Sequence, residues 1–246
     1  MSQRVVFLGS KPIGYQCLQY LIAQQQALDI EVVAVRTRMR KEFGAEGNDL
    51  AALATQAGIP LLASLDDIPE CDLIYSVQHH ELLQARHISR AGTIAVNLHL
   101  APLPEYRGCN QFSFAIMDEV REFGVTLHEI DTRIDHGAIL FESRFSVPES
   151  CWVNELYELT FVAATELFKS SLPDLMAGRY QKVPQAALLE QRGTSLHFRD
   201  EIGDLKAISL DDPEALIDKK IRATYMPGFE PPYIMVNGQK MLLVKP

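Results

Sequence analysis

The chain has 246 residues, of which 47% are hydrophobic, and a formal net charge of −9. A chain of this length buries enough apolar surface to fold without a structural metal or disulfides. The acidic balance disfavours nucleic acid as the main partner, because phosphate backbones are bound by clustered Lys and Arg.

The cysteines and the apolar runs indicate the compartment. Four cysteines lie far apart with no CxxC pair, so we expect reduced thiols, no zinc site and no redox motif. The N-terminal apolar run is too short for a signal peptide, and no run of 18 apolar residues occurs. We therefore predict a cytoplasmic protein without a membrane partner.

The first hundred residues alternate between apolar runs and segments with helical spacing. Runs at 5–8, 31–35, 60–62, 73–77 and 93–98 predict strands, and 15–25, 49–57 and 80–88 predict helices. This order predicts an α/β fold, a Rossmann-like and mostly parallel sheet with helices on both faces.

The pattern changes after Gly108. Residues 124–130 and 138–147 are β-rich and flank a charged loop, and an amphipathic helix follows up to Gly178. Asn237-Gly238 then separates two apolar runs, a strong hairpin signal. We therefore expect a catalytic domain over 1–180 and a small C-terminal subdomain with a β-hairpin over 181–246.

Two polar residues share one face of the strand predicted at 93–98. Side chains alternate along a strand, so Asn97 and His99 project together at its carboxyl end, which is the edge where open parallel sheets bind ligands. Taken alone, the pair is better explained as a hydrogen-bonded strand end.

The residues that follow favour a functional reading. Asn97-x-His99 continues into Leu103-Pro104, then Tyr106-Arg107-Gly108, and Asp135-His136-Gly137 comes after a second interval. This series resembles the folate-dependent formyltransferases over residues 1 to about 180. Two residues depart from the family pattern: Ala101 stands near a position where many relatives carry serine, and Gln111 stands where many carry proline. These differences concern the shape of the acceptor pocket.

The resemblance implies 10-formyltetrahydrofolate as co-substrate, no metal, and a catalytic set of Asn97, His99 and Asp135. Asn97 would donate to the oxyanion of a tetrahedral intermediate, and His99 would exchange a proton with the attacking amine. Asp135 would orient and support His99.

The resemblance also implies binding residues. By position it assigns the folate to Gln78, His79, His80, Thr132, Arg133 and Ile134. It assigns the acceptor to Lys11, Tyr106, Arg107 and Asn110. Tyr106 and Arg107 are alternatively explained as bracing for their loop.

Weaker signals point mostly to structure. The Gly9 to Gly14 segment lacks both a P-loop and a dinucleotide fingerprint, which leaves a tight turn or a phosphate contact through Lys11. His79-His80-Glu81 lacks the second histidine of a zinc helix, so no metal is expected. His87, His128 and His197 have no partner pattern and are interpreted as ordinary residues.

For the acceptor, the short tail and the acidic charge favour the nucleotide-sugar N-formyltransferases of surface polysaccharide (lipopolysaccharide O-antigen) biosynthesis. The predicted acceptor is thus the amine of a nucleotide-linked deoxyamino sugar, with a homodimer formed at the C-terminal hairpin. The alternatives are another amine acceptor such as tRNA or a purine precursor, a formyl-folate hydrolase, and a non-catalytic folate- or nucleotide-binding protein.

Overall fold

A computed structural model describes residues 2–38 and 49–244. Within these residues, six strands form the main sheet in the order β2-β1-β3-β4-β6-β7. Their bounds are β1 Gln3–Gly9, β2 Ile30–Arg36, β3 Cys71–Val77, β4 Ala91–His99, β6 Glu122–Glu129 and β7 Ile139–Ser146. The first four pair in parallel, whereas β6 and β7 are antiparallel to their neighbours. The predicted α/β, mostly parallel sheet is confirmed.

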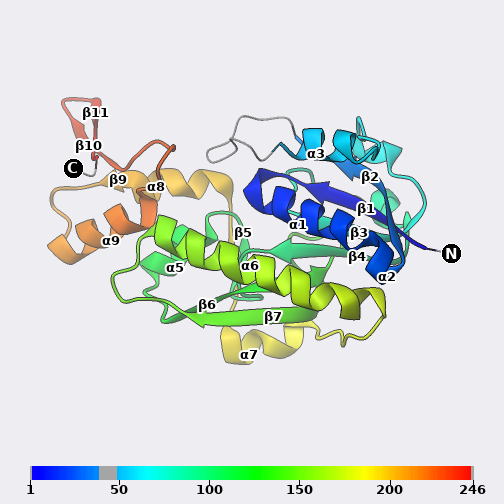
Figure 1. Cartoon of the computed structure of the whole chain (residues 1–246). Helices are drawn as coiled ribbons and strands as arrows, with labels where there is room; N and C mark the ends of the chain where they lie inside the picture. The colour runs from blue at the N-terminus through cyan, green and yellow to red at the C-terminus, as the bar shows by residue number, and fades with distance from the viewer. Residues whose placement is uncertain (1, 39–48, 245–246) are drawn as a thin grey trace.

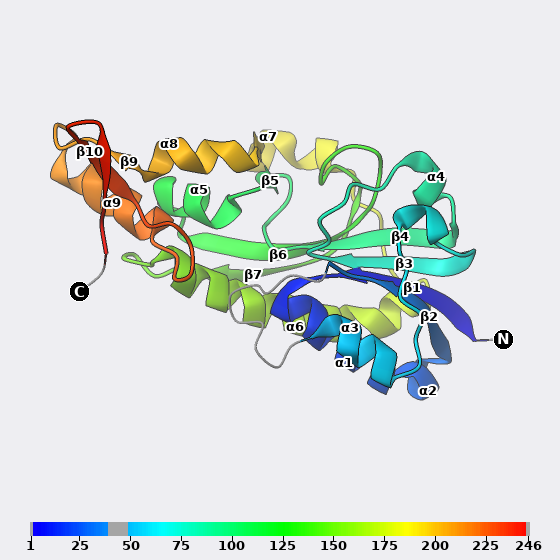
Figure 2. The same ribbon diagram turned by 90° about the horizontal axis from the view of Figure 1, so that it is seen from above.

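Helices cover both faces of this sheet, as Figure 2 shows. On one face lie α1 Lys11–Ala23, α2 Gln25–Leu28, α3 Leu50–Gln56 and the long α6 Val153–Met176. Toward the other face lie α4 Ala85–Ile88, α5 Gln111–Met117 and α7 Leu189–Arg192. None of the helices in the described ranges is long and apolar enough to cross a lipid bilayer.

The two faces of the sheet have separate cores because side chains alternate along each strand. Phe7, Tyr75 and Val96 pack under α1 and α6, where the ring centroids of Tyr75 and Phe168 lie 4.8 Å apart. Ala95 belongs instead to the smaller core on the opposite face. This alternation is the one predicted for the segment that carries Asn97 and His99.

Two of the predicted elements are wrong, and the bounds of a third differ. Residues 60–62 form only an isolated bridge, Val35 to Leu61, and of 80–88 only Ala85–Ile88 is helical. The first helix begins at Lys11 rather than at residue 15, because proline is well suited to a first turn, where no backbone N–H is needed. The tight turn therefore shortens to Gly9 and Ser10.

The C-terminal part forms a small subdomain at one end of the molecule (Figure 1). It contains α8 Ile202–Lys206, α9 Glu214–Thr224, and a sheet of β9 Ala207–Ile208, β10 Tyr233–Val236 and β11 Gln239–Leu242. The predicted hairpin is confirmed: Asn237 and Gly238 both have positive φ, as a type I′ turn requires.

The segment that precedes this subdomain returns to the main sheet. Val183 bridges Ile139 at the start of β7, with both backbone bonds at 2.9 Å. Further on, β8 Ser195–His197 pairs in parallel with β5 Tyr106–Gly108. Residues 183–197 therefore lie against the loop that follows β4.

Gly137 sits where two backbone segments cross closely. A Cβ atom built there would lie 1.9 Å from the carbonyl oxygen of Glu129. We predict that Gly137→Ala lowers the free energy of unfolding by at least about 2 kcal/mol, because backbone must move to relieve the overlap. Thermal and denaturant unfolding measure this loss.

The matched control is Gly203→Ala in α8, where nothing lies within 4 Å of the added methyl group. We expect this variant to keep or slightly raise stability, because alanine favours a helix over glycine. Equal stability losses in the two variants would contradict the close crossing at Gly137.

Candidate active site

The polar end of β4 faces the antiparallel strand β6. In their register Asn97 lies opposite His128, and His99 lies opposite Thr126. Directly opposed residues of antiparallel strands have side chains in contact on one face. The register therefore adds a second imidazole to the Asn97 and His99 pair predicted from the sequence.

The His99 imidazole has one nitrogen committed and one available. Nε2 lies 2.8 Å from the backbone oxygen of Tyr106, which only accepts, so Nε2 carries the proton. Nδ1 lies 3.6 Å from Asp135 Oδ2. The side chain is 5% exposed, so its orientation is held by packing as well. Nδ1 is thus the nitrogen that can exchange a proton.

Asn97 and His128 form a pair with complementary hydrogen-bonding groups. His128 Nδ1 donates to the backbone oxygen of Glu129 at 2.8 Å, which leaves Nε2 as an acceptor. Asn97 Nδ2 donates to this Nε2 at 3.1 Å and lies 3.5 Å from Asp135 Oδ1. Because the second distance is at the limit of a hydrogen bond, the N–H that points toward Asp135 is the one that a developing oxyanion can take over.

The Asp135 carboxylate lies at the centre of the group. Its Oδ2 accepts the Gly108 N–H at 2.9 Å, and its Oδ1 lies 3.5 Å from His128 Nε2. Burial by itself raises the pKa of this carboxyl, but His99, His128 and the Gly108 N–H together hold the pKa well below its ordinary value. The carboxylate therefore stays ionised at neutral pH.

The group brings together an amide donor, an imidazole nitrogen and a carboxylate at one edge of the sheet. These are the functions that acyl transfer to an amine requires: an oxyanion donor, a proton acceptor and an anion that supports the imidazolium. Asn97, His99 and Asp135, predicted as a set, do converge.

Sequence reasoning missed His128, which was interpreted as ordinary. Two signals point to it: His128 lies in the β-rich stretch 124–130, and it precedes Asp135 in the charged loop by seven residues. The register between β4 and β6, which places His128 against Asn97, is a tertiary feature that no local pattern specifies.

The loop after β4 holds Tyr106, Arg107 and Asn110 by contacts within the protein. The Tyr106 hydroxyl donates to Asp118 at 2.7 Å, and its ring packs on Phe123. Arg107 Nε donates to Ser195 O at 3.4 Å, and Asn110 Nδ2 donates to Phe198 O at 2.8 Å. For Tyr106 and Arg107 these contacts match the bracing alternative.

Lys11 lies at the same edge of the sheet. Its Nζ donates to Gln78 Oε1 at 2.9 Å, and the backbone oxygen of Gln78 accepts from the Ser10 hydroxyl. Gln78 has a positive φ and directly follows β3, the neighbour of β4. The resemblance assigns Lys11 to the acceptor and Gln78 to the folate, but their side chains are hydrogen-bonded to each other.

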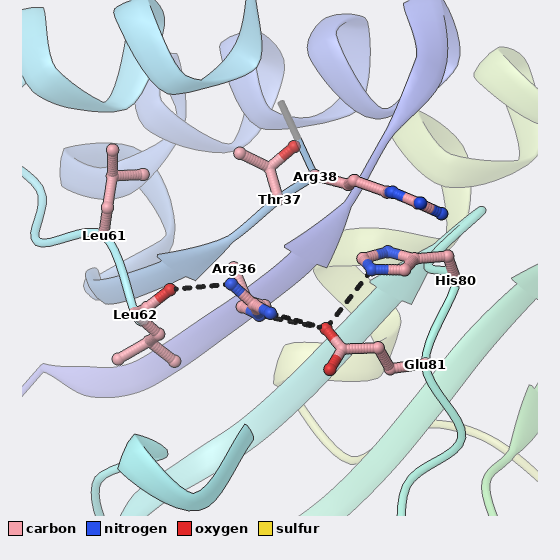
Figure 3. A pocket seen from close by; sticks show the side chains of 7 residues that line it. All are labelled: Arg36, Thr37, Arg38, Leu61, Leu62, His80 and Glu81. Carbon is pink, nitrogen blue, oxygen red and sulfur yellow. Dashed lines mark hydrogen bonds and ion pairs between the residues drawn. The ribbon is translucent and has the colours of Figure 1, made fainter. Parts of the chain in front are cut away.

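A pocket of about 520 Å³ lies at the carboxyl end of β2, and its lining shares no residue with the catalytic group (Figure 3). It is lined by Arg36, Thr37, Arg38, Leu61, Leu62, His80 and Glu81. Arg36 Nη2 pairs with Glu81 Oε1 at 2.9 Å, and His80 Nε2 lies 3.4 Å from the same oxygen. The predicted folate residue His80 thus borders a polar recess with two guanidinium groups.

His79, His80 and Glu81 place three potential metal ligands within 4.8 Å of one another. The Glu81 carboxylate is already paired with Arg36, and a cation there would compete with that guanidinium. The expected absence of a metal stays a prediction.

The remaining predicted folate residues precede Asp135 in its loop. The backbone N–H of Arg133 donates to Asp131 Oδ1 at 2.7 Å. Thr132 and Arg133 are exposed and Ile134 is half-buried. The side chains of Thr132 and Arg133 are therefore accessible to solvent, while the Asp131 side chain holds the backbone of the loop.

The family model for formyl transferases matches residues 3–170, which include Asn97, His99, His128 and Asp135. The chain belongs to the formyl transferase family. It is 30% identical over 168 residues to the GDP-perosamine N-formyltransferase of Brucella melitensis, an alignment that covers 68% of this chain and 62% of that protein. It is 27% identical over 195 residues to the methionyl-tRNA formyltransferase of Lacticaseibacillus casei, with 74% and 60% covered.

Among solved structures, this formyl transferase family member resembles WlaRD, a sugar 3N-formyl transferase solved with dTDP and 5-N-formyl-THF. The TM-score is 0.79 at 21% identity, and the superposition covers 98% of this chain and 85% of that one. The chain spans about three fifths of the length of the curated relatives it matches. The likeness confirms the fold.

The buried imidazole of His79 predicts a pH-dependent stability. Its side chain is 1% exposed, neither ring nitrogen has a hydrogen-bond partner, and burial lowers its pKa from 6.5 to about 4. Between these pH values the unfolded chain binds the proton more tightly than the folded one. Stability should therefore fall as pH falls from 6.5 to 4, by up to about 1.4 kcal/mol per pH unit.

In His79→Phe this slope should flatten without loss of stability at pH 7, because no hydrogen bond is removed. Urea unfolding at pH 7, 6, 5 and 4.5 measures the slope. His136→Gln, at a half-buried histidine, is the control and should keep the wild-type slope. An unchanged slope in His79→Phe would mean that another group titrates in this window.

Proposed function

We propose that the protein transfers the formyl group of 10-formyltetrahydrofolate to the amine of a nucleotide-linked deoxyamino sugar. The observation that carries the proposal is the convergence of Asn97, His99 and Asp135 at the carboxyl edge of the sheet. The sugar N-formyltransferases among its relatives support the acceptor class.

The reaction follows from the three side chains. The amine attacks the formyl carbon, the N–H of Asn97 that points toward Asp135 donates to the oxygen that becomes negative, and His99 Nδ1 takes the proton that the amine loses. Asp135 supports the resulting imidazolium from 3.6 Å. The same proton then goes to the folate nitrogen as its bond to the formyl carbon breaks.

The binding residues are proposed by position. Gln78, His79, His80, Thr132, Arg133 and Ile134 would bind the folate, and Lys11, Tyr106, Arg107 and Asn110 would bind the acceptor. Two observations support an acceptor that carries phosphate groups: Lys11 Nζ lies at Gln78, directly after β3, and Arg36 and Arg38 line the pocket at the end of β2. Because Tyr106 is buried, it would act on the acceptor through the loop rather than by contact.

Initiator tRNA is the second candidate acceptor, because methionyl-tRNA formyltransferases are also among the relatives. The net charge of −9 favours the nucleotide sugar, since tRNA binding draws on clustered Lys and Arg. We further propose that the enzyme acts in the cytoplasm, in O-antigen biosynthesis.

The test is to mix the protein with 10-formyltetrahydrofolate and single acceptors. The panel contains dTDP-, UDP-, GDP- and CMP-linked amino sugars, charged initiator tRNA, and buffer alone. We predict the mass gain of one formyl group on a nucleotide sugar. In Asn97→Ala, His99→Ala and Asp135→Ala turnover should fall by about a hundredfold or more with an unchanged circular dichroism spectrum.

Each other outcome identifies a different function. If tRNA alone is formylated, the acceptor is tRNA and not a nucleotide sugar. Formate release at the same rate without an acceptor would indicate a hydrolase. Folate binding without any turnover would indicate a binding protein. Near wild-type turnover in His99→Ala would overturn the proposed mechanism.

We also propose a homodimer formed through the C-terminal hairpin. Met235, Val236, Met241 and Leu242 on this hairpin are between 43% and 56% exposed, and β11 is an edge strand. Exposed apolar side chains on an edge strand favour association with a second copy.

Met241→Glu should therefore shift the protein from dimer to monomer in sedimentation velocity. Leu210→Glu, at an exposed apolar residue outside the hairpin, should remain a dimer. A monomeric wild type, or a dimer that Met241→Glu leaves intact, would contradict this interface.

A further inference from the structure

Gln185 contacts the backbone on both sides of His136, within the loop of the catalytic carboxylate. Its Nε2 donates to the backbone oxygen of Asp135 at 2.9 Å and to that of Gly137 at 2.8 Å. The side chain comes from η2 Gln185–Leu188, and the residue is 4% exposed. Both N–H groups of one amide therefore hold a single loop.

This loop has a conformation that needs external support. Asp135 has a φ of 46°, a left-handed value that is unfavourable for a residue with a side chain. Gly137 on the other side is pressed against Glu129. The two carbonyl groups that Gln185 satisfies belong to this strained stretch, and buried carbonyl groups without partners are costly.

The neighbouring contacts keep Gln185 in place. The bridge between Ile139 and Val183 lies two residues before Gln185 in the chain, and Pro184 fixes the backbone between them. Farther on, β8 pairs with β5, and Gly108 of β5 donates its N–H to the Asp135 side chain. Residues 183–197 thus support Asp135 at its backbone and, through β5, at its carboxylate.

The position of the carboxylate depends on this backbone. Asp135 Oδ2 lies 3.6 Å from His99 Nδ1 and 2.9 Å from Gly108 N, and a rotation of the peptide planes at 135–137 would change both distances. A displacement of about 1 Å at a catalytic group can lower turnover by about a hundredfold.

We propose that Gln185 is a positioning residue for catalysis, which acts through Asp135 by holding the loop 135–137 with its amide. Gln185 lies outside residues 3–170, the part matched by the family model. The inference rests on the proposed formyl transfer for its kinetic test, and a second measurement that needs no substrate tests it separately.

The informative substitution is Gln185→Met, which keeps the length and volume of the side chain and removes both N–H donors. Gln185→Glu has the same shape and is a second variant in case the first does not fold. It removes the same two hydrogen bonds, because it places a carboxylate oxygen against the backbone oxygens of Asp135 and Gly137. Gln25→Met is the matched control: Gln25 Oε1 accepts the Val32 N–H at 2.8 Å, at the far end of the sheet from the site.

For Gln185→Met we expect kcat to fall by about tenfold or more, with a smaller change in KM for the acceptor. In the background of Asp135→Asn the same substitution should change kcat by less than about twofold, because the group it positions is gone. Gln25→Met should leave kcat unchanged. An equal fall of kcat in both backgrounds, or wild-type kcat in Gln185→Met, would overturn the proposal.

Hydrogen exchange followed by mass spectrometry gives the readout without substrate. Peptides that cover 131–138 should exchange several-fold faster in Gln185→Met, while peptides that cover β3 exchange as in the wild type. If the wild type formylates no acceptor, the proposed function fails, and exchange alone decides whether Gln185 holds the loop. Unchanged exchange over 131–138 would refute the role of Gln185 whatever the reaction is.

Discussion

The arrangement of the site depends on one buried anion. The Asp135 carboxylate is removed from water, and such a group is stable only where charges and hydrogen-bond donors replace its hydration. Gly108 in the loop after β4 and Asn97 on β4 donate N–H groups to it at 2.9 and 3.5 Å. The imidazoles of His99 on β4 and His128 on β6 lie 3.6 and 3.5 Å from its oxygens. The carboxylate therefore links three parts of the chain, and its low pKa keeps it charged beside the imidazole that moves the proton.

The strand direction changes within the sheet beside this site. β3 and β4 run in parallel and present their carboxyl ends at one edge, whereas β6 runs back along β4. The loop that leaves β6 begins opposite Val96, short of the end of β4, and it folds back so that Asp135 reaches Asn97 and His99. The close approach of Gly137 to the backbone of Glu129 lies on this return path.

The site also extends beyond the region that the family model matches. Arg192 pairs with Glu142 at 2.8 Å and donates to the backbone oxygen of Leu103 at 3.2 Å, which ties α7 to β7 and to the loop after β4. Together with Gln185 and β8, this contact packs residues 183–197 against the loop of Asp135 and the loop after β4. The division into two domains at residue 180 stays a prediction.

The sequence by itself determined the α/β class, the common face of Asn97 and His99, and the C-terminal hairpin, because each rests on a local period or on turn chemistry. The charged loop at 131–137 drew attention to this part of the chain, and the spacing of a family pattern then identified Asp135 within it. The short bridge at Leu61 and the brief α4 were mispredicted because an apolar run or helical spacing does not say whether a partner strand or a packing face is available. His128 and Gln185 were decided only by the tertiary structure: one depends on strand register and the other on a contact between residues 50 positions apart. Both are long-range pairings that form when the sheet assembles, so no single segment of the chain encodes them.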